Sequence, residues 1–401
     1  MENQVQSRRP KPAASRKAQI SHAIATRDLT ALKQLARTEG GLETTRLRRQ
    51  AWPLLLNFRS LTDSGNSRIA KHHEEGQVSL DIPRINIPQS PELSRTKQAA
   101  MRRQRQLTHV VCSVLRSYPW LSYYQGFHEL SLVFLLVFGS ERPAAEAVRM
   151  VALFFVRDAM ASNLDHVLQQ LQLLYVLLKA ISPQVHSILT DLDVPPFFAI
   201  SWVLTWFSHD LSSFVDICRI YDFLLVSPPL QVVYMAAVMI KQREGDILAL
   251  ERDFASLHTA LVRLPAQVNS WQPIIDDSCC LLSEYPPTKL QLMGNCRLPK
   301  LSAVNTFEQS WKRLDPARPL QFTSLVSVKD RHPLAIASSK STAAAADDNR
   351  MAQVIDLTST AQKARGLAVQ YRWPLVVATA ASVTMLMYAW LLMHQFQQLY
   401  P

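Results

Sequence analysis

The sequence predicts an all-α protein with a single membrane-spanning helix near its C-terminal end. Glycine occurs only 9 times in 401 residues, about a third of ordinary usage, and scarce glycine disfavours folds that need many tight turns and hairpins. Apolar residues recur at helical spacing, as at Leu164, Val167, Leu168 and Leu171, whereas strand-like alternation is not sustained. Residues 374–393 form an apolar run of 20 without a charge, enough for a helix to cross about 30 Å of hydrocarbon.

One continuous helical domain is predicted over residues 25–310, because prolines fall between the periodic segments, where they end or begin helices. Ser162 and Asp165 resemble a capping box at the start of the clearest helix. Residues 1–24 are basic and are expected to form a disordered arm. The other expected helices cover residues 28–37, 96–117, 126–138, 144–157, 196–208, 214–225, 230–241 and 251–263.

The C-terminal part is expected to be a tail anchor. Residues 311–372 are rich in small polar residues and predict a flexible linker. Residues 373–393 form the transmembrane segment, and residues 394–401 are a short lumenal tail. Basic residues upstream of the segment place the domain in the cytosol. Two internal apolar runs, 130–139 and 195–207, are too short to span a bilayer and are expected to lie in the core.

Composition and motifs exclude several classes of function. The formal charge is +11, but no zinc finger, RRM signature or basic zipper is present, so a nucleic-acid partner is not expected. Five cysteines without a Cys-x-x-Cys pair fit a reducing compartment.

There is no P-loop, dinucleotide fingerprint, zinc-protease motif or esterase elbow. His72 and His73 are not accompanied by other residues in a metal-ligand spacing. His209 beside Asp210 indicates a hydrogen bond at the end of a helix. No metal or cofactor of its own is therefore expected, and the chain is not expected to be an autonomous hydrolase.

Two residues are suited to completing the active site of another protein. Hydrolysis of GTP is slow because charge builds on the phosphoryl oxygens and the attacking water is poorly oriented. An arginine supplied in trans compensates the charge, and a glutamine amide can hold the water. Arg84 in "DIPRINI" and Gln125 in "YYQGFHEL" are the right residue types, although each alone is more often a solvated surface residue.

Four ordered blocks resemble the TBC-domain family of Rab GTPase-activating proteins. "VSLDIPR", ending at Arg84, is similar to the family's apolar-x-x-Asp-x-x-Arg motif, and "YYQG", containing Gln125, to its Tyr-x-Gln-Gly motif. "GLETTRLRRQAWPLLLN" from Gly41 resembles the opening Arg-x-x-x-Trp-Pro box, and "RIYDFLLVSPPL" from Arg219 the late Arg-Ile-Trp-Asp helix. The resemblance implies an all-helical, V-shaped TBC domain whose groove receives the GTPase switch regions.

The resemblance also implies roles for individual residues. Arg84 would be an arginine finger and Gln125 a glutamine finger, a dual-finger mechanism in which the activator's glutamine replaces that of the GTPase. Asp81 would hold the finger loop by a charge-assisted hydrogen bond, or act as a helix N-cap, or both.

Five further residues would support the domain. Tyr123 and Trp52 would serve packing and loop support. Arg48, Arg219 and Asp222 would be structural polar groups, with Arg48 the first candidate among them to touch the partner. The sequence departs from the family pattern at Pro83 before the finger and at Ile85 after it, and both positions bear on the geometry of the finger loop.

The expected partner is a Rab-family GTPase in its GTP form, which carries the nucleotide and Mg²⁺. The motifs together with the C-terminal anchor most resemble a branch that resides on the endoplasmic reticulum membrane and acts on export toward the Golgi, where membrane proteins would be further partners. The alternative is a catalytically inactive, membrane-tethered scaffold, which would not need both fingers. A SNARE-type fusion protein is a third reading, but the linker lacks heptads.

Overall fold

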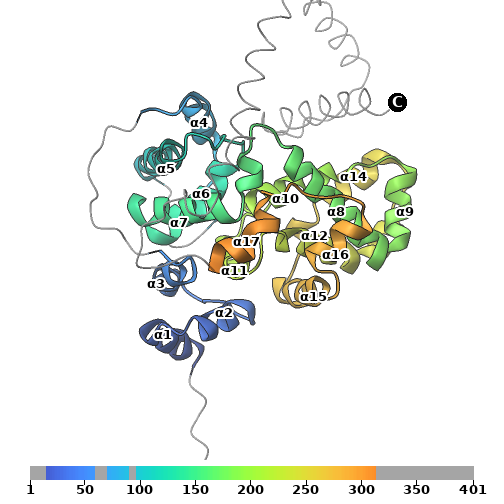
Figure 1. Cartoon of the computed structure of the whole chain (residues 1–401), viewed down its shortest axis with the longest axis horizontal. Coiled ribbons are helices and arrows are strands. Elements are labelled where there is room, and N and C mark those ends of the chain that lie inside the picture. Colours follow the sequence, from blue (N-terminus) through green and yellow to red (C-terminus); the bar gives the residue numbers. More distant parts are fainter. Residues whose placement is uncertain (1–14, 59–69, 90–95, 313–401) are drawn as a thin grey trace, which may run out of the picture. The chain divides into compact units, whose positions relative to one another are not determined.

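The computed structural model describes residues 15–58, 70–89 and 96–312, and these residues are helical, as predicted. The described residues, drawn as the coloured ribbon of Figure 1, all belong to one compact unit, Met1–Ala335. They contain no strand, and their one isolated β-bridge pairs Gln89 with Ser213 in parallel. The predicted arm before residue 15 and the predicted linker, anchor and tail lie outside them, except for the start of the linker.

The N-terminal helices are α1 (Arg16–Thr26), α2 (Leu29–Arg37) and α3 (Thr45–Leu55). Each begins at a side-chain cap, because Ser15, Asp28 and Thr44 accept hydrogen bonds from backbone N–H groups of the first turn. The prediction of a disordered arm through residue 24 is therefore wrong from Arg16 onward. The sequence-based expectation overlooked that the face bearing Ile20 and Ala23 is buried in the core.

The next helices carry the candidate site. They are α4 (Glu75–Asp81), the short 3₁₀ helix η1 (Ile82–Arg84), α5 (Lys97–Ser117), α6 (Phe127–Phe138) and α7 (Glu141–Phe154). Helices α5, α6 and α7 pack against one another, and α4 and η1 pack on α5 (Figure 1). Helix α7 begins three residues earlier than predicted, at Glu141, because proline is compatible with the first turn, where backbone N–H groups have no helical partner.

The remaining helices build the larger part of the core. They are η2 (Arg157–Met160), α8 (Asp165–Ile181), α9 (Pro183–Asp191), η3 (Pro196–Ala199), α10 (Ile200–Thr205), α11 (Phe214–Leu224), α12 (Gln231–Gln242), α13 (Glu244–Leu248), α14 (Phe254–Val262), η4 (Pro265–Gln267), α15 (Trp271–Glu284), α16 (Pro287–Met293) and α17 (Ala303–Lys312). Helix α12 packs between α8 and α15 and is buried from Gln231 to Ile240. The predicted capping box before α8 is wrong: Asn163, rather than Ser162, accepts the Asp165 N–H at 3.2 Å.

The two internal apolar runs lie in the core, as predicted. All but one residue of α6 is buried, and so are Phe198 and Trp202 in the second run. Among the described residues no single helix meets the length and hydropathy needed to cross a membrane. The segments Pro183–Asp191 and Pro196–Thr205 meet that test only together, and they are bent by 119°.

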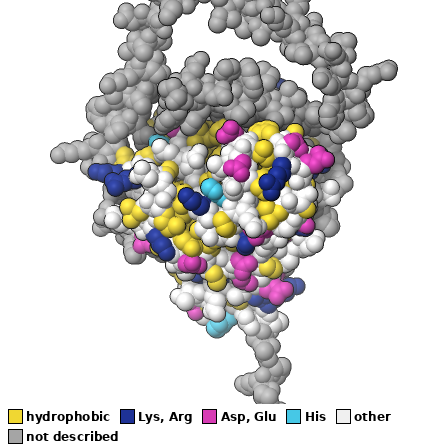
Figure 2. All heavy atoms as spheres, turned by 90° about the vertical axis from the view of Figure 1, so that its right-hand side faces the viewer, with side chains coloured by type: hydrophobic (Ala, Val, Ile, Leu, Met, Phe, Trp, Pro, Cys, Tyr) yellow, Lys and Arg dark blue, Asp and Glu magenta, His cyan; other side chains and the backbone are white. Residues whose placement is uncertain are grey.

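The surface carries charges of both signs. On the side of the molecule nearest α9 and α14, hydrophobic, basic and acidic side chains are interspersed (Figure 2). This face therefore shows no single-sign field of the kind that a polyanion would recognise.

Candidate functional site

Arg84 and Gln125 are both exposed, and among the described residues neither side chain has a hydrogen-bond or ion-pair partner. Arg84 is the last residue of η1, and Gln125 lies in the loop that leads into α6. Their polar groups remain available because no neighbouring side chain or backbone group uses them. An unpaired guanidinium and an unpaired amide on adjoining loops are suited to contact a bound partner.

A buried hydrogen bond joins the two loops. The Tyr123 hydroxyl donates to Asp81 Oδ2 at 2.9 Å, and both residues are buried. Asp81 Oδ1 accepts a second hydrogen bond from Gln77 Nε2 at 2.9 Å. These two hydrogen bonds are consistent with the predicted role of Asp81 in holding the finger loop in place. The alternative role as a cap is wrong, since its side chain makes no capping hydrogen bond to η1.

His128 extends this connection into α6, and sequence reasoning missed it. Its Nδ1 lies 2.6 Å from the Tyr123 hydroxyl, and the imidazole is buried. Burial raises the pKa of Tyr123 and lowers the pKa of His128. The phenol therefore keeps its proton for Asp81, and its oxygen can accept from a neutral imidazole protonated at Nδ1. Nothing in the spacing of "YYQGFHEL" indicates this contact, because it depends on how the loop turns before the helix.

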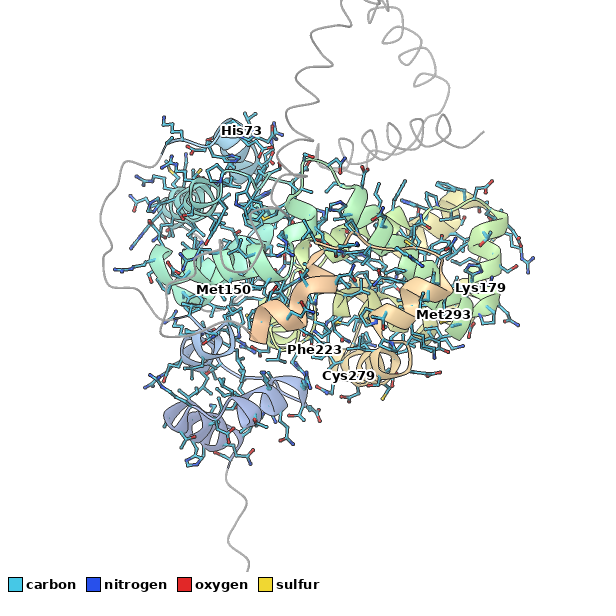
Figure 3. All side chains as sticks on the ribbon, viewed as in Figure 1. His73, Met150, Lys179, Phe223, Cys279 and Met293 are labelled. Carbon is cyan, nitrogen blue, oxygen red and sulfur yellow. The ribbon has the colours of Figure 1, made fainter. Side chains whose placement is uncertain are left out.

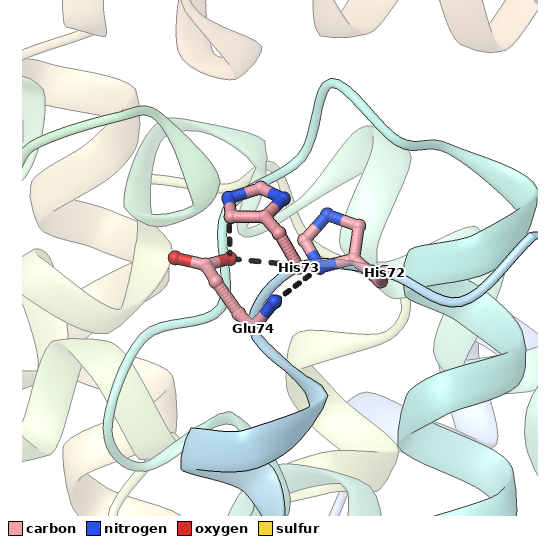
Figure 4. A group of neighbouring side chains, drawn as sticks. All are labelled: His72, His73 and Glu74. Atoms are coloured by element: carbon pink, nitrogen blue, oxygen red, sulfur yellow. Dashed lines mark hydrogen bonds and ion pairs between the residues drawn. The ribbon is translucent and has the colours of Figure 1, made fainter.

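The turn before α4, which carries His72, His73 and Glu74 (Figure 4), supports the glutamine loop from a second direction. Glu74 Oε2 accepts the backbone N–H of Tyr123 at 2.6 Å, and His72 Nδ1 accepts the backbone N–H of Glu74 at 3.2 Å. Next to it, Glu75 pairs with Arg116 on α5 at 2.6 Å. The hydrogen bond from Arg116 lowers the pKa of Glu75 to about 2. The start of α4 is thus fixed to both α5 and the Tyr-x-Gln-Gly loop.

The same turn groups three possible metal ligands. Ligand atoms of His72, His73 and Glu74 all lie within 4.8 Å of one another, so the expectation that the two histidines lack metal-ligand company is wrong. Two of these groups already accept hydrogen bonds, since Glu74 accepts the backbone N–H of Tyr123 and His72 accepts the backbone N–H of Glu74. The arrangement is explained by support of the loop, and the prediction of no metal site stays a prediction.

The finger loop is fixed at both ends. Ile82, at the start of η1, is buried, and Ile85 packs against the core directly after Arg84. Downstream, Gln89 donates to the carbonyl oxygen of Ser212 at 2.7 Å and accepts from Phe214 N at 3.2 Å, which ties the loop to the start of α11. Ile85 differs from the residue that the family pattern leads one to expect, and its apolar side chain anchors the loop to the core while Arg84 stays exposed.

Arg48 does not fulfil its predicted role as a partner contact. It is only 4% exposed and pairs with Asp222 at 2.9 Å. Asp222 also accepts from Trp52 Nε1 at 2.8 Å and from Leu42 N at 2.9 Å. The Arg48 guanidinium is needed in the core, because the negative charge of the buried Asp222 carboxylate is destabilising unless a positive charge pairs with it. The prediction of a structural polar group is confirmed for Arg48 and Asp222, and Trp52 packs in the core.

Arg219 completes this structural cluster. It donates to the carbonyl oxygens of Ala36, Arg37 and Thr38, which end α2. Burial lowers the pKa of Arg219 to about 10. Its role is to satisfy carbonyl groups that the end of a helix leaves unpaired.

The family model "Rab-GTPase-TBC domain" matches residues 45–248 of the chain, which include Arg84, Gln125 and the Asp222 cluster. The chain belongs to this family. The match begins at α3 and ends at α13, so helices α1, α2 and α14–α17 lie outside the matched part of this TBC protein.

Curated relatives agree with the assignment. The chain is 33% identical over 313 residues to "TBC1 domain family member 20" of Homo sapiens, covering 76% of this chain and 77% of that protein. It is 33% identical to the Bos taurus protein of the same name, covering 66% of this chain and 65% of that protein, just under two thirds. It is 31% identical to "GTPase-activating protein gyp10" of Schizosaccharomyces pombe, and the match covers 69% of this chain and 74% of that protein.

Solved structures agree with the TBC fold. The Ypt/Rab-GAP domain of Gyp1p matches with a TM-score of 0.53 at 17% identity, covering 66% of this chain and 99% of that domain. The Chlamydomonas flagellar RabGAP TBC domain matches with a TM-score of 0.51 at 16% identity, and the match covers 64% of this chain and 88% of that domain. At such identities the likeness concerns the fold alone.

Proposed function

We propose that this TBC protein accelerates GTP hydrolysis by a Rab-family GTPase, with Arg84 and Gln125 acting together in the partner's active site. One observation carries the proposal. Arg84 and Gln125 are exposed and have no side-chain partner in the described part of the chain. Asp81 and Tyr123, a few residues before them, are buried and bonded to each other. The structure thus presents two free polar side chains on loops that are fixed to one another.

The chemistry follows from what each side chain can donate or accept. The Arg84 guanidinium places positive charge against oxygens on which negative charge develops as the γ-phosphoryl group leaves. The Gln125 carbonyl oxygen can accept from the attacking water while its NH₂ group donates to a backbone carbonyl. GTP and Mg²⁺ belong to the GTPase, so the TBC protein needs no cofactor of its own and is not an enzyme in isolation.

The proposal extends to the target and the membrane. A Rab of the early secretory pathway is supported by the motif resemblance and the C-terminal apolar run, whereas the names of the curated relatives support GTPase activation in general. A tail anchor at residues 373–393, in the endoplasmic reticulum membrane with the TBC domain facing the cytosol, is supported by the uncharged apolar run and its basic upstream flank. These residues lie outside the described part of the structure.

The test is single-turnover GTP hydrolysis by a panel of Rab proteins with the full-length chain and its Arg84→Ala and Gln125→Ala variants. An arginine finger contributes about 10³- to 10⁵-fold to the rate. Lys179→Ala is the control, because it removes an exposed positive charge on α8, away from the turn that carries His73 (Figure 3).

The outcomes separate activation from binding alone. If one Rab responds and both finger variants abolish the effect while Lys179→Ala does not, the dual-finger mechanism holds. If a Rab binds in its GTP form without faster hydrolysis, the chain is a tethered scaffold and the proposal is wrong. If the finger variants activate as well as the parent chain, the catalytic groups lie elsewhere.

A further inference from the structure

The segment from Leu204 to Asp210 supports the loop that carries Gln125. The Tyr124 hydroxyl donates to the Leu204 carbonyl oxygen at 2.8 Å. Gly126 has φ +108°, and a Cβ atom added there would lie 2.9 Å from the Thr205 Cγ2 methyl group. The residues on both sides of Gln125 thus rest against the C-terminal end of α10.

The backbone of this supporting segment is in an unfavourable conformation. Trp206 and Phe207 have φ values of 52° and 64°, the left-handed region that side chains with a Cβ atom rarely adopt. Both side chains are buried. Trp206 packs against Tyr221 with ring centroids 5.3 Å apart, and Phe207 against Trp271 at 5.2 Å. Aromatic packing therefore maintains the turn, and the turn determines where the residues after it point.

His209 follows this turn and contacts the first turn of α6. Its Nδ1 lies 2.8 Å from Glu129 Oε2, and Glu129 is four residues after Gln125 in the chain. The hydrogen bond to Glu129 raises the pKa of His209 to about 9, so the imidazole is protonated near neutral pH.

The Tyr123 and Tyr221 phenols, whose electrostatic surroundings include Glu129, keep their protons because burial raises the pKa of each. His128 and Asp210 also face this pair. His128, on α6, has its Nε2 4.0 Å from Glu129 Oε1, and burial lowers its pKa. Asp210, beside His209, accepts from Ser201 at 3.0 Å, and burial raises its pKa to about 6. Near neutral pH the imidazolium of His209 and the carboxylate of Glu129 therefore form an ion pair.

We propose that His209 is a positioning residue for Gln125, which it holds by clamping Glu129 at the start of α6 from the left-handed turn behind it. This inference rests on the proposed function. Its physical basis is that the Gln125 side chain is exposed and bonds to none of the residues in the described ranges, so its placement depends on the backbone that carries it. Small displacements of a catalytic group cost large factors in rate.

The test compares His209→Ala and Glu129→Gln with the parent full-length chain in single-turnover GTP hydrolysis with a responding Rab. At saturating activator the rate is expected to fall about tenfold in either variant, while the half-saturating concentration stays within about twofold, since positioning affects the reaction more than binding. His109→Ala is the matched control, because His109 forms an exposed pair with Glu141 between α5 and α7.

A double substitution separates positioning from general damage to the fold. In a Gln125→Ala background, His209→Ala should cause no further loss, because its effect passes through Gln125. The ratio of parent to His209→Ala rates should also decline toward one as pH rises through about 9, where the imidazolium loses its proton.

Other outcomes overturn the inference in distinguishable ways. Equal loss from His209→Ala with and without Gln125 would show that His209 acts elsewhere, and an unchanged rate in both single variants would show that the clamp is unnecessary. Either result would leave the proposed function standing. An inactive parent chain with every Rab would overturn the proposed function, and this inference with it.

Discussion

The Tyr123 hydroxyl donates a hydrogen bond of 2.9 Å to the buried Asp81 carboxylate, and this contact joins two segments 42 residues apart in the chain. Each segment carries one exposed candidate finger just after the joined residue. The two motifs of this TBC protein are therefore one structural unit, in which the buried pair fixes the positions from which Arg84 and Gln125 project.

Tyr123→Phe should lower both stability and activation. The substitution leaves one Asp81 oxygen and the His128 imidazole without their shared partner in the interior, at a cost of about 1–3 kcal/mol. Urea denaturation measures the stability, and single-turnover GTP hydrolysis measures the activation. Tyr234→Phe is the control, because Tyr234 is also buried and donates to the Tyr285 carbonyl oxygen at 2.5 Å on another part of the domain. Equal effects of the two variants on activation would contradict a special role for the Asp81–Tyr123 contact.

Gly126→Ala should impair activation more than a helical glycine substitution does. The new Cβ atom would meet the Thr205 methyl group at 2.9 Å, and φ +108° is strained for alanine. Gly76→Ala is the control, because nothing lies within 4 Å of its added Cβ and α4 continues through it. Thr205→Ser, which removes the methyl group, should restore part of the lost activation in the double variant. No restoration would mean that backbone strain alone accounts for the defect.

Arg48→Ala should destabilise the domain by about 3–5 kcal/mol, because it leaves the Asp222 carboxylate buried with its charge uncompensated. Arg46→Ala, on the exposed face of the same helix, should change the free energy of unfolding by less than about 0.5 kcal/mol. Urea denaturation distinguishes them. If Arg48→Ala leaves stability unchanged and instead weakens binding to the Rab, the original expectation that Arg48 contacts the partner would regain support.

Glu75 should contribute stability that disappears in acid. Its pKa is lowered from 4.5 to about 2 by Arg116, so the folded state binds this proton less readily than the unfolded state does. The contribution is complete above the unfolded pKa and is lost as pH falls from about 4.5 toward 2. The stability difference between the parent chain and Glu75→Gln should therefore shrink between pH 6 and pH 3. Glu39→Gln, which alters an exposed carboxylate, should show no such convergence.

The sequence by itself determined the helical class, most helix positions and the family. Apolar periodicity placed α5 and α6 within a residue of their observed limits, because this signal acts within a few turns of the chain. The four motif blocks, which contain Arg84 and Gln125, led to the family that the comparisons established. Local signals were insufficient where a side chain could find more than one partner, as at Asn163, which took the bond expected of Ser162.

Tertiary structure alone decided which polar residues are buried and which remain free. Arg48 and Arg84 are both arginines within motif blocks. Asp222 and its neighbours enclose Arg48, whereas Arg84 is exposed at the end of η1 and pairs with no residue that the structure describes. The contacts of His128 and His209 arise in the same way, since each depends on a loop brought close by packing of helices distant in sequence. Burial and hydrogen bonding are properties of the assembled core, and a residue's type and spacing do not contain them.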